Sequence, residues 1–439
     1  MSNTNSTSIE KKRFLLSNYF RTTIALLLML VCPLAVILIW YTSVGYEGSL
    51  SKMLASMALA TLLEIFPKPT AVACKIILIF IVMQAILIVL LPGKKYISPV
   101  TPAGNQVTYK DNGLLAWLIT HLLLYIGAYQ LKWFSPTIIY DNFGSILTFC
   151  SVGSLLFCCF LYVKGVWFPS SKDAGSSGNF IIDFFWGTEL HPRILEFDLK
   201  QFINCRLGMM SWSLIILSFL AKQYEIYHYV SNSMLVAVIL QLVYIGKFFW
   251  WESGYLATLD VMHDRFGFYI CWGITTWLPC VYTWQTLYLV NHPYELGMGY
   301  ASCILFLGLI AIYINYNADA QRQRVRQTNG QCTVWGKPPE VIIAKYKTSD
   351  GEERQNLLLV SGWWGISRHF HYIAEIAIAL LWTLPCQFDH VLPYFYVTYL
   401  TILLVHRSFR DDERCQKKYG IYWEKYCVGV PYRILPGVF

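Results

Sequence analysis

The feature that most constrains this chain is its first apolar segment, residues 22–46, which contains no charged residue. About 20 apolar residues suffice for a helix to cross the hydrocarbon core of a bilayer. A cleavable signal peptide has a shorter apolar core of about 7–15 residues and ends in small side chains. This segment instead carries Ile39, Trp40 and Tyr41 near its far end. We therefore interpret it as a retained membrane span.

Similar apolar segments recur along the chain, of which 56% is hydrophobic and only 14% is charged. A soluble domain has about 25% charged residues. The last segment is too long for one span and is expected to fold as a helical hairpin. We predict an all-α, polytopic membrane helix bundle with about ten transmembrane helices. The segments lie near 22–43, 53–66, 75–92, 114–131, 145–166, 208–221, 233–250, 267–290, 300–316 and 373–405.

The formal net charge of +8 does not require a nucleic-acid partner. The basic residues gather between and after the apolar segments, as the positive-inside rule describes for cytoplasmic loops. Lys11, Lys12, Arg13 and Arg21 precede the first span and predict a cytoplasmic N-terminus. An even number of spans would return the basic C-terminal tail to the same side.

Composition divides the chain into three parts. Residues 1–20 are polar and rich in Ser, Asn and Thr, and we expect a disordered tail. Residues 21–316 hold most of the apolar segments, and residues 317–439 begin with a long basic stretch. The 13 cysteines form no C-x-x-C pair, so neither a disulfide framework nor a metal site is predicted.

Ionisable residues beside apolar segments are candidate functional groups, because a charge in lipid is costly and usually faces a cavity or a partner. Asp260 and Asp264 are four residues apart, so a helix would place both carboxylates on one face. Each would then raise the pKa of the other, as a proton donor needs. His263 lies between them. A polar helix end at the headgroup level would give the same pattern.

Two further pairs have the same four-residue spacing. Arg322 and Arg326 would present two guanidinium groups on one helix face, which suits a phosphate; contact with anionic lipids is the alternative. Arg407 and Asp411 follow the last apolar segment and are a further candidate site. A helix end stabilised by basic residues would give the same pattern. The sequence has no G-x-G-x-x-G turn and no P-loop. A nucleotide would therefore have to be held by the membrane helices themselves.

Several longer motifs resemble the sterol reductase family. SGWWGISRHFHY at 361–372 resembles its C-terminal signature, as do HRSFRDDERC, KKYGIYWEKY and VPYRILPGVF within 406–439. Earlier motifs resemble the branch that reduces the sterol C7–C8 double bond, and the resemblance runs from about residue 112 to the C-terminus. These motifs are NGLLAWLITHLLLY (112–125), WFSPTIIYDNFG (133–144), GTELHPRI (187–194), LDVMHDRFGFY (259–269) and CTVWGKPPEVI (332–342).

The resemblance implies an NADPH-dependent oxidoreductase that protonates the C7–C8 double bond and adds a hydride. Its proton donor would be one of Asp260, His263, Asp264 and Asp411, with Tyr282 as a further candidate. His371 stands where the family usually has Asn, which changes the donor and acceptor geometry. The family's cofactor contacts fall on Arg322, Arg326, Leu359, Trp364, His371, Tyr372, Arg407, Asp411 and Tyr419.

The same resemblance assigns roles to the parts of the chain. Residues 21–316 would form the N-terminal bundle and part of the sterol pocket, which the sterol enters from the membrane. Residues 317–439 would bind the cofactor and end in a cytoplasmic tail. A eukaryotic chain would lie among the lipids and sterol-synthesis enzymes of the endoplasmic reticulum, and a bacterial one in the inner membrane. The alternatives are reduction of another double bond, such as Δ14, and a non-catalytic sterol-binding protein.

Overall fold

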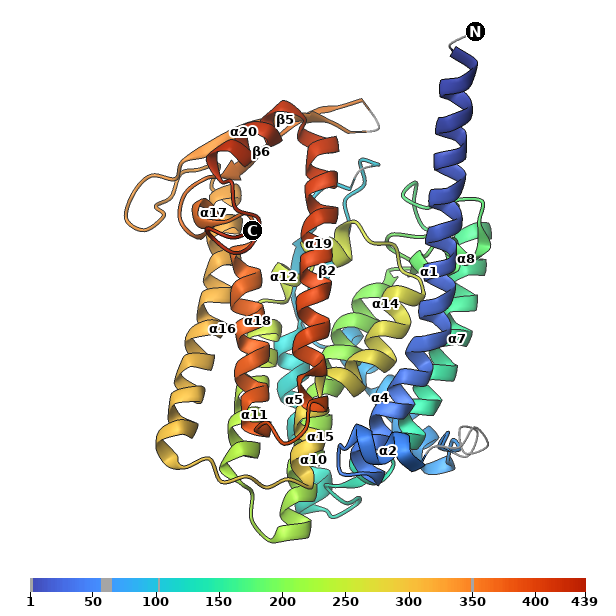
Figure 1. Cartoon of the computed structure of the whole chain (residues 1–439), viewed down its shortest axis with the longest axis vertical. Coiled ribbons are helices and arrows are strands. Elements are labelled where there is room, and N and C mark those ends of the chain that lie inside the picture. Colours follow the sequence, from blue (N-terminus) through green and yellow to red (C-terminus); the bar gives the residue numbers. More distant parts are fainter. Residues whose placement is uncertain (1–2, 57–64, 102, 349–350) are drawn as a thin grey trace.

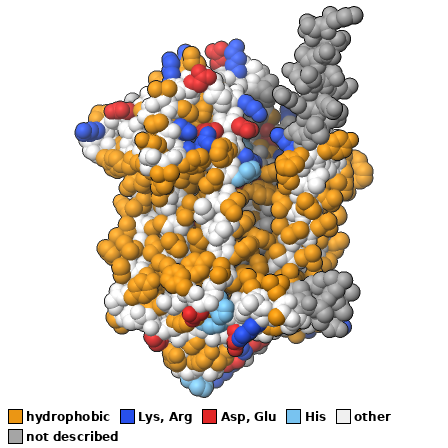
Figure 2. All heavy atoms as spheres, in the orientation of Figure 1, with side chains coloured by type: hydrophobic (Ala, Val, Ile, Leu, Met, Phe, Trp, Pro, Cys, Tyr) orange, Lys and Arg blue, Asp and Glu red, His pale blue; other side chains and the backbone are white. Residues whose placement is uncertain are grey.

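The fold is a bundle of long helices that run side by side (Figure 1). It is a computed structural model, and it describes residues 3–56, 65–101, 103–348 and 351–439, with side chains from Asn18 onward. Figure 2 shows a broad hydrophobic band across the middle of the face in view, with Lys, Arg, Asp and Glu gathered toward its two ends. Such a band is the surface that a bilayer requires.

The helices are named here with their bounds. The first half contains α1 (Asn3–Gly45), α2 (Leu50–Ser56), α4 (Ala71–Leu90), α5 (Gly113–Tyr125), α6 (Ile138–Asp141), α7 (Phe143–Trp167), α8 (Phe180–Trp186), α9 (Leu199–Gln201) and α10 (Met210–Tyr227). The second half contains α11 (Asn232–Trp250), α12 (Glu252–Tyr255), α13 (Leu259–Met262), α14 (Phe268–Trp272), α15 (Trp284–Val290), α16 (Met298–Gln327), α17 (Trp363–Ile366), α18 (Phe370–Thr383), α19 (Phe395–Tyr419) and α20 (Ile421–Gly429).

The prediction of a polytopic helical membrane protein is confirmed. Among the described residues, seven helical segments are long and apolar enough to cross a membrane. The unit from α14 to α15, together with α18 and α19, supplies further apolar helices, and the segment 373–405 forms the expected hairpin of α18 and α19. The predicted segment near 53–66 lies largely outside the described residues. The seven segments are Asn18–Gly45, Ala71–Leu90, Gly113–Gln130, Phe143–Trp167, Leu199–Tyr227, Asn232–Trp250 and Met298–Gln327.

The N-terminal tail differs from the expectation. Residues 1–20 were expected to be a disordered tail, but α1 begins at Asn3. Extending an existing helix fixes one residue for each hydrogen bond gained, whereas starting a new helix is costly. The apolar span therefore provides a helix onto which the polar residues before it can add.

Within the described parts of the chain, three segments have π-helical geometry, which is rare and often marks a functional site. They are η1 (Ile126–Gln130), η2 (Phe202–Met209) and η3 (Gly273–Tyr282). Pro279 lies inside η3 and cannot donate the backbone hydrogen bond of a regular helix. This wider helix follows α14 and brings Ile274, Trp277 and Tyr282 to the wall of the central cavity.

Small antiparallel hairpins decorate the otherwise helical fold. They are β1 (Lys94–Ile97) with β2 (Thr108–Asp111), β3 (Arg193–Ile194) with β4 (Phe197–Asp198), and β5 (Val341–Lys347) with β6 (Glu353–Leu359). The β5–β6 hairpin is in register from Val341 opposite Leu359 to Lys347 opposite Glu353. It lies across one end of the bundle (Figure 1) and packs against α19 and α20. This packing forms a small core of its own around Tyr419 and Trp423.

Candidate functional site

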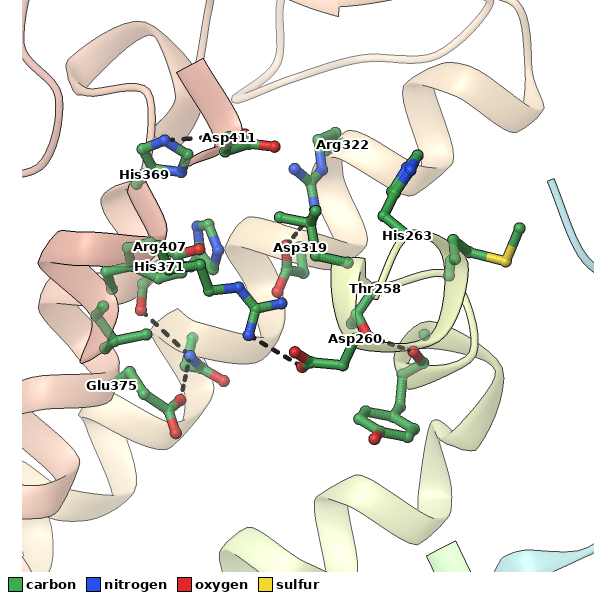
Figure 3. A pocket seen from close by; sticks show the side chains of 18 of the residues that line it. Thr258, Asp260, His263, Asp319, Arg322, His369, His371, Glu375, Arg407 and Asp411 are labelled. Atoms are coloured by element: carbon green, nitrogen blue, oxygen red, sulfur yellow. Dashed lines mark hydrogen bonds and ion pairs between the residues drawn. The ribbon is translucent and has the colours of Figure 1, made fainter. Parts of the chain in front are cut away.

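A cavity of about 500 Å³ lies between α16, α18 and α19 on one side and α12, α13 and η3 on the other. One end of it is polar and carries most of the charged side chains; Figure 3 shows these pointing into a common space. The other end is apolar and aromatic. It is lined by Met209, Ile270, Trp277, Leu278, Leu400 and Leu404.

A glycine and a tryptophan shape the floor of the polar end. Gly362 has φ +64° and is packed so closely that a Cβ would lie 2.2 Å from Gln321 Oε1. It allows the chain to turn sharply into α17, which buries Trp364. The Trp364 indole donates to the Ala318 carbonyl oxygen (2.7 Å), and the Arg322 guanidinium lies 3.9 Å from the centroid of its ring. Arg322 is therefore fixed by a cation–π contact within the cavity.

An ion pair crosses the middle of the cavity. Arg407 of α19 donates to Asp260 of α13 at 2.9 Å, and the two point toward one another in Figure 3. The Nε of Arg407 is buried without a hydrogen-bond partner among the described residues. An unpaired donor on a cavity wall is costly, so it is a natural contact for a bound molecule.

The expected placement of Asp260 and Asp264 on one helix face is wrong. Asp260 and Asp264 do not form a carboxylate pair, because α13 ends at Met262. Asp264 instead pairs with Arg410 and does not line the cavity. Arg407 and Asp411 do lie on one helix, but each binds another residue: Arg407 binds Asp260, and Asp411 accepts from Arg414 at 2.6 Å.

A second group of charges surrounds Asp411. Arg414 also donates to His263 Nε2 at 2.9 Å, and His369 Nε2 lies 3.9 Å from the Asp411 carboxylate. Burial lowers the pKa of His263 and of His369 to about 3. Burial alone would raise the pKa of Asp411, but the Arg414 guanidinium overrides it, and the pKa falls to about 2. At neutral pH both imidazoles are neutral, and Asp411 is an ionised hydrogen-bond acceptor.

Sequence reasoning missed a network between the two ends of the cavity. Tyr244 donates to Glu375 at 2.6 Å, Asn315 donates to the other oxygen of Glu375 at 2.8 Å, and Lys247 donates to Asn315 at 2.8 Å. The four residues come from α11, α16 and α18. Lys247 was the available signal, because it is a lone charge in an apolar segment. No local spacing links it to Glu375.

The other predicted site residues gather in this cavity. Asp260, His263 and Asp411 line it, as does Tyr282. Each residue expected to contact a cofactor also lines it: Arg322, Arg326, Leu359, Trp364, His371, Tyr372, Arg407, Asp411 and Tyr419. The arrangement joins a cationic chamber, suited to a phosphate-bearing molecule, to an apolar chamber, suited to a rigid hydrocarbon.

Comparison with known proteins identifies a family and several relatives. The family described as "Ergosterol biosynthesis ERG4/ERG24 family" matches residues 17–439. The chain is 52% identical to 7-dehydrocholesterol reductase of Arabidopsis thaliana over 94% of this chain and 96% of that protein. It is 41% identical to 7-dehydrocholesterol reductase of Xenopus laevis, with 96% and 93% covered. It is 37% identical to Delta(14)-sterol reductase of Methylotuvimicrobium alcaliphilum, with 94% of each covered.

Proposed function

The chain belongs to the ergosterol biosynthesis ERG4/ERG24 family, and we propose that it is a membrane-embedded reductase of the sterol C7–C8 double bond that uses NADPH. The observation that carries this proposal is that a cationic chamber and an apolar chamber belong to one and the same cavity. The relatives at 52% and 41% identity carry the name 7-dehydrocholesterol reductase, and the one named Delta(14)-sterol reductase is 37% identical. We therefore favour Δ7 over Δ14 reduction.

The residues of the polar chamber fit NADPH. Arg322 and Arg326 are one helical turn apart on α16 and would hold phosphate oxygens. Trp364 presents a ring beside His371, with the ring centroids 5.0 Å apart. The Nδ1 of His371 is buried without a partner among the described residues, so it can bind a polar group of the cofactor. When bound, NADPH would supply the hydride.

The chain itself must supply the proton and keep water away. Of the candidates, Asp260 and His263 stand on the side of the cavity that continues into η3, whereas Asp264 lies outside the cavity. Asp260 lines the cavity and is oriented by Arg407. We propose that the Asp260 carboxyl, in its protonated form, gives its proton to one carbon of the double bond, and that the carboxylate it leaves pairs with Arg407. Asp411 holds Arg414, which donates to His263. The apolar walls would exclude water from the cation that protonation creates.

The sterol would enter from the bilayer, since the apolar chamber lies between the membrane helices. We place the termini in the cytoplasm, because α1 begins and the chain ends at the same end of the bundle (Figure 1), where Figure 2 shows Lys and Arg side chains. In a eukaryotic cell the membrane would be that of the endoplasmic reticulum, where other enzymes of sterol synthesis are candidate neighbours.

The test is reduction of a defined sterol in membranes that contain the protein. We expect NADPH to cause loss of the conjugated Δ5,7 diene and a gain of two hydrogens, observed as about two mass units by mass spectrometry. Turnover of a Δ8,14-sterol with the Δ5,7-sterol untouched would show Δ14 reduction. Binding of sterol without turnover of either would show the non-catalytic alternative. Asp260→Asn then tests the proton donor, because unchanged turnover would exclude it.

A further inference from the structure

A buried lysine outside the cavity has no role in the site described above. Lys200 belongs to the short helix α9, is 1% exposed and does not line the cavity. Burying an ammonium group is costly unless its charge and its N–H donors are satisfied. Lys200 has no ion pair among the residues that the structure describes. The nearby carboxylates of Asp198 and Asp264 each pair with an arginine instead.

The ammonium group of Lys200 donates to three backbone carbonyl oxygens. They belong to Val261 at 2.9 Å, Leu190 at 3.3 Å and Asp264 at 2.5 Å. An ammonium group has three N–H donors and no acceptor, so these three carbonyls use all of its donors. Val261 lies in α13, which has four residues, and the last four carbonyls of a helix have no partner within it. Lys200 therefore caps α13 and the turn that follows it.

Lys200 acts from a fixed support. Asp198 caps the start of α9, where its carboxylate accepts from the Gln201 N–H at 2.8 Å. The same carboxylate pairs with Arg193 at 3.2 Å, between the two strands of the β3–β4 hairpin. The Leu199 N–H also donates to the Pro192 carbonyl oxygen, at 3.0 Å. The hairpin thus holds the backbone of Lys200 while its side chain reaches α13.

The segment that Lys200 caps carries two side chains of the site. Asp260 and His263 both line the cavity, and both are labelled on this segment in Figure 3. Under the proposed mechanism Asp260 is protonated before transfer and a carboxylate after it. Its bond to Arg407 is strong only in the carboxylate form, because a neutral carboxyl loses the charge that strengthens the bond. The bonds of Lys200 go to backbone carbonyls and are the same in both forms.

We propose that Lys200 is a positioning residue for sterol reduction, which fixes the backbone of residues 261–264 and so holds the protonated Asp260 carboxyl at the double bond. This inference rests on the proposed function. Proton transfer requires close placement of donor and acceptor, and a misplacement of about 1 Å can cost about 100-fold in rate. Because Lys200 does not line the cavity, it acts through Asp260 and not on the sterol.

The experiment uses the purified full-length protein in detergent with NADPH and a Δ5,7-sterol. Lys200→Met removes the donors from a side chain of similar length, and Lys200→Gln keeps two N–H donors on a shorter one. Lys222→Met is the matched control, because Lys222 is also mostly buried (18% exposed) but binds Asp141 and Glu225 and does not line the cavity. For each variant, kcat, the KM for the sterol and the thermal midpoint are measured. Each Lys200 variant is also combined with Asp260→Asn.

We expect Lys200→Met to lower kcat by about 10- to 100-fold and to change the KM for the sterol by less than about threefold, because the cavity walls are retained. Lys200→Gln should fall between Lys200→Met and the unmodified protein. Lys222→Met should lower the thermal midpoint but keep kcat within about twofold. The double variant Lys200→Met with Asp260→Asn should be within about twofold of Asp260→Asn alone, since residues that act as a unit are not additive.

A second readout needs no turnover. The N–H groups of His263 and Asp264 donate to the Leu259 carbonyl oxygen at 2.9 and 3.1 Å, and local opening of this turn exposes them to hydrogen exchange. Exchange over residues 259–266, followed by mass spectrometry, should be faster in Lys200→Met and unchanged in Lys222→Met. If Lys200→Met yields no folded protein, Lys200→Gln carries both measurements and the combination with Asp260→Asn.

Two results would overturn the role of Lys200. One is a loss of kcat that multiplies in the double variant, because Lys200 would then act independently of Asp260. The other is faster exchange over residues 259–266 with kcat unchanged, which would make Lys200 a structural cap only. Both leave the proposed function standing if the unmodified protein reduces the Δ5,7-sterol. Full turnover by Asp260→Asn would exclude the proton donor and Lys200 together, and no turnover by the unmodified protein would overturn the proposed function and this inference with it.

Discussion

Two arginine–carboxylate pairs join distant parts of this chain in opposite surroundings. Arg206 of η2 and Glu252 of α12 have side chains that are 0% exposed, and the guanidinium donates to both carboxylate oxygens, at 2.7 and 2.8 Å. Arg407 and Asp260 have side chains that are 21% and 28% exposed, and they face the cavity. The same two functional groups are therefore enclosed in one place and accessible in the other.

The neighbours of each pair explain what it does. Around the enclosed pair, Arg206 also donates to Asn112 Oδ1, and Glu252 also accepts from the Gly113 N–H and from Gln201. These bonds join α5, η2 and α12, and neither Arg206 nor Glu252 lines the cavity. Arg407 donates to Asp260, and its Nε is buried without a partner among the described residues. The Nε of Arg206 also lacks such a partner, but Arg206 does not line the cavity whereas Arg407 does. The larger number of hydrogen bonds around the enclosed pair indicates a structural role, and the place of Arg407 and Asp260 on the cavity wall makes them available to a ligand.

The largest expected effect comes from breaking the enclosed pair. Glu252→Gln should destabilise the protein by about 3–5 kcal/mol, because it leaves the Arg206 charge buried and unpaired. Thermal unfolding followed by tryptophan fluorescence in detergent measures this. Glu225→Gln is the matched control, since Glu225 is 51% exposed and pairs with Lys222. A loss below about 1 kcal/mol would mean that the enclosed pair is no more structural than a surface pair.

The accessible pair should show the reverse pattern. Asp260→Asn is expected to lower turnover about 100-fold, which corresponds to about 2.7 kcal/mol of transition-state stabilisation. Its thermal stability should change by less than about 1 kcal/mol, because both partners are partly exposed. Sterol turnover and thermal unfolding are measured on the same preparation. A variant that unfolds as readily as Glu252→Gln, with its remaining folded fraction fully active, would erase the distinction between the two pairs.

The sequence alone was enough to predict the membrane bundle and many of the residues that line the cavity. It did not predict which charged residues pair with one another. Apolar length sets the spans, and Arg322 and Arg326 lie on one long helix, so their spacing is informative. Asp260 and Asp264 have the same spacing, yet α13 ends between them. Arg407 contacts Asp260 across 147 positions, a separation that no local pattern encodes.

Acid should destabilise the region around the cavity. Burial lowers the pKa of His263 and His369 to about 3, whereas an unfolded histidine titrates near about 6.5. Between these values the unfolded state binds more protons, so stability falls with falling pH by up to about 1.4 kcal/mol per pH unit for each histidine. Above about pH 6.5 this contribution is fully present.

We therefore expect the thermal midpoint to fall between pH 7.5 and 5.5, and His263→Gln to flatten part of that fall. His406→Gln serves as the control, because His406 is exposed. If the thermal midpoint fell with pH as steeply in His263→Gln as in the unmodified protein, His263 would not be a histidine that stays neutral in the folded chain.

The smallest expected effect concerns a carboxylate that does not line the cavity. It tests whether a place on the cavity wall is what makes a carboxylate functional. Asp264 is an aspartate four residues after Asp260. Its side chain is 6% exposed, pairs with Arg410 and does not line the cavity. Asp264→Asn should therefore change turnover by less than about threefold and cost about 1 kcal/mol of stability, since the amide can still accept from Arg410. If Asp264→Asn lowered turnover as far as Asp260→Asn, the two carboxylates would act together as their spacing first suggested, and access would not be what makes a pair functional.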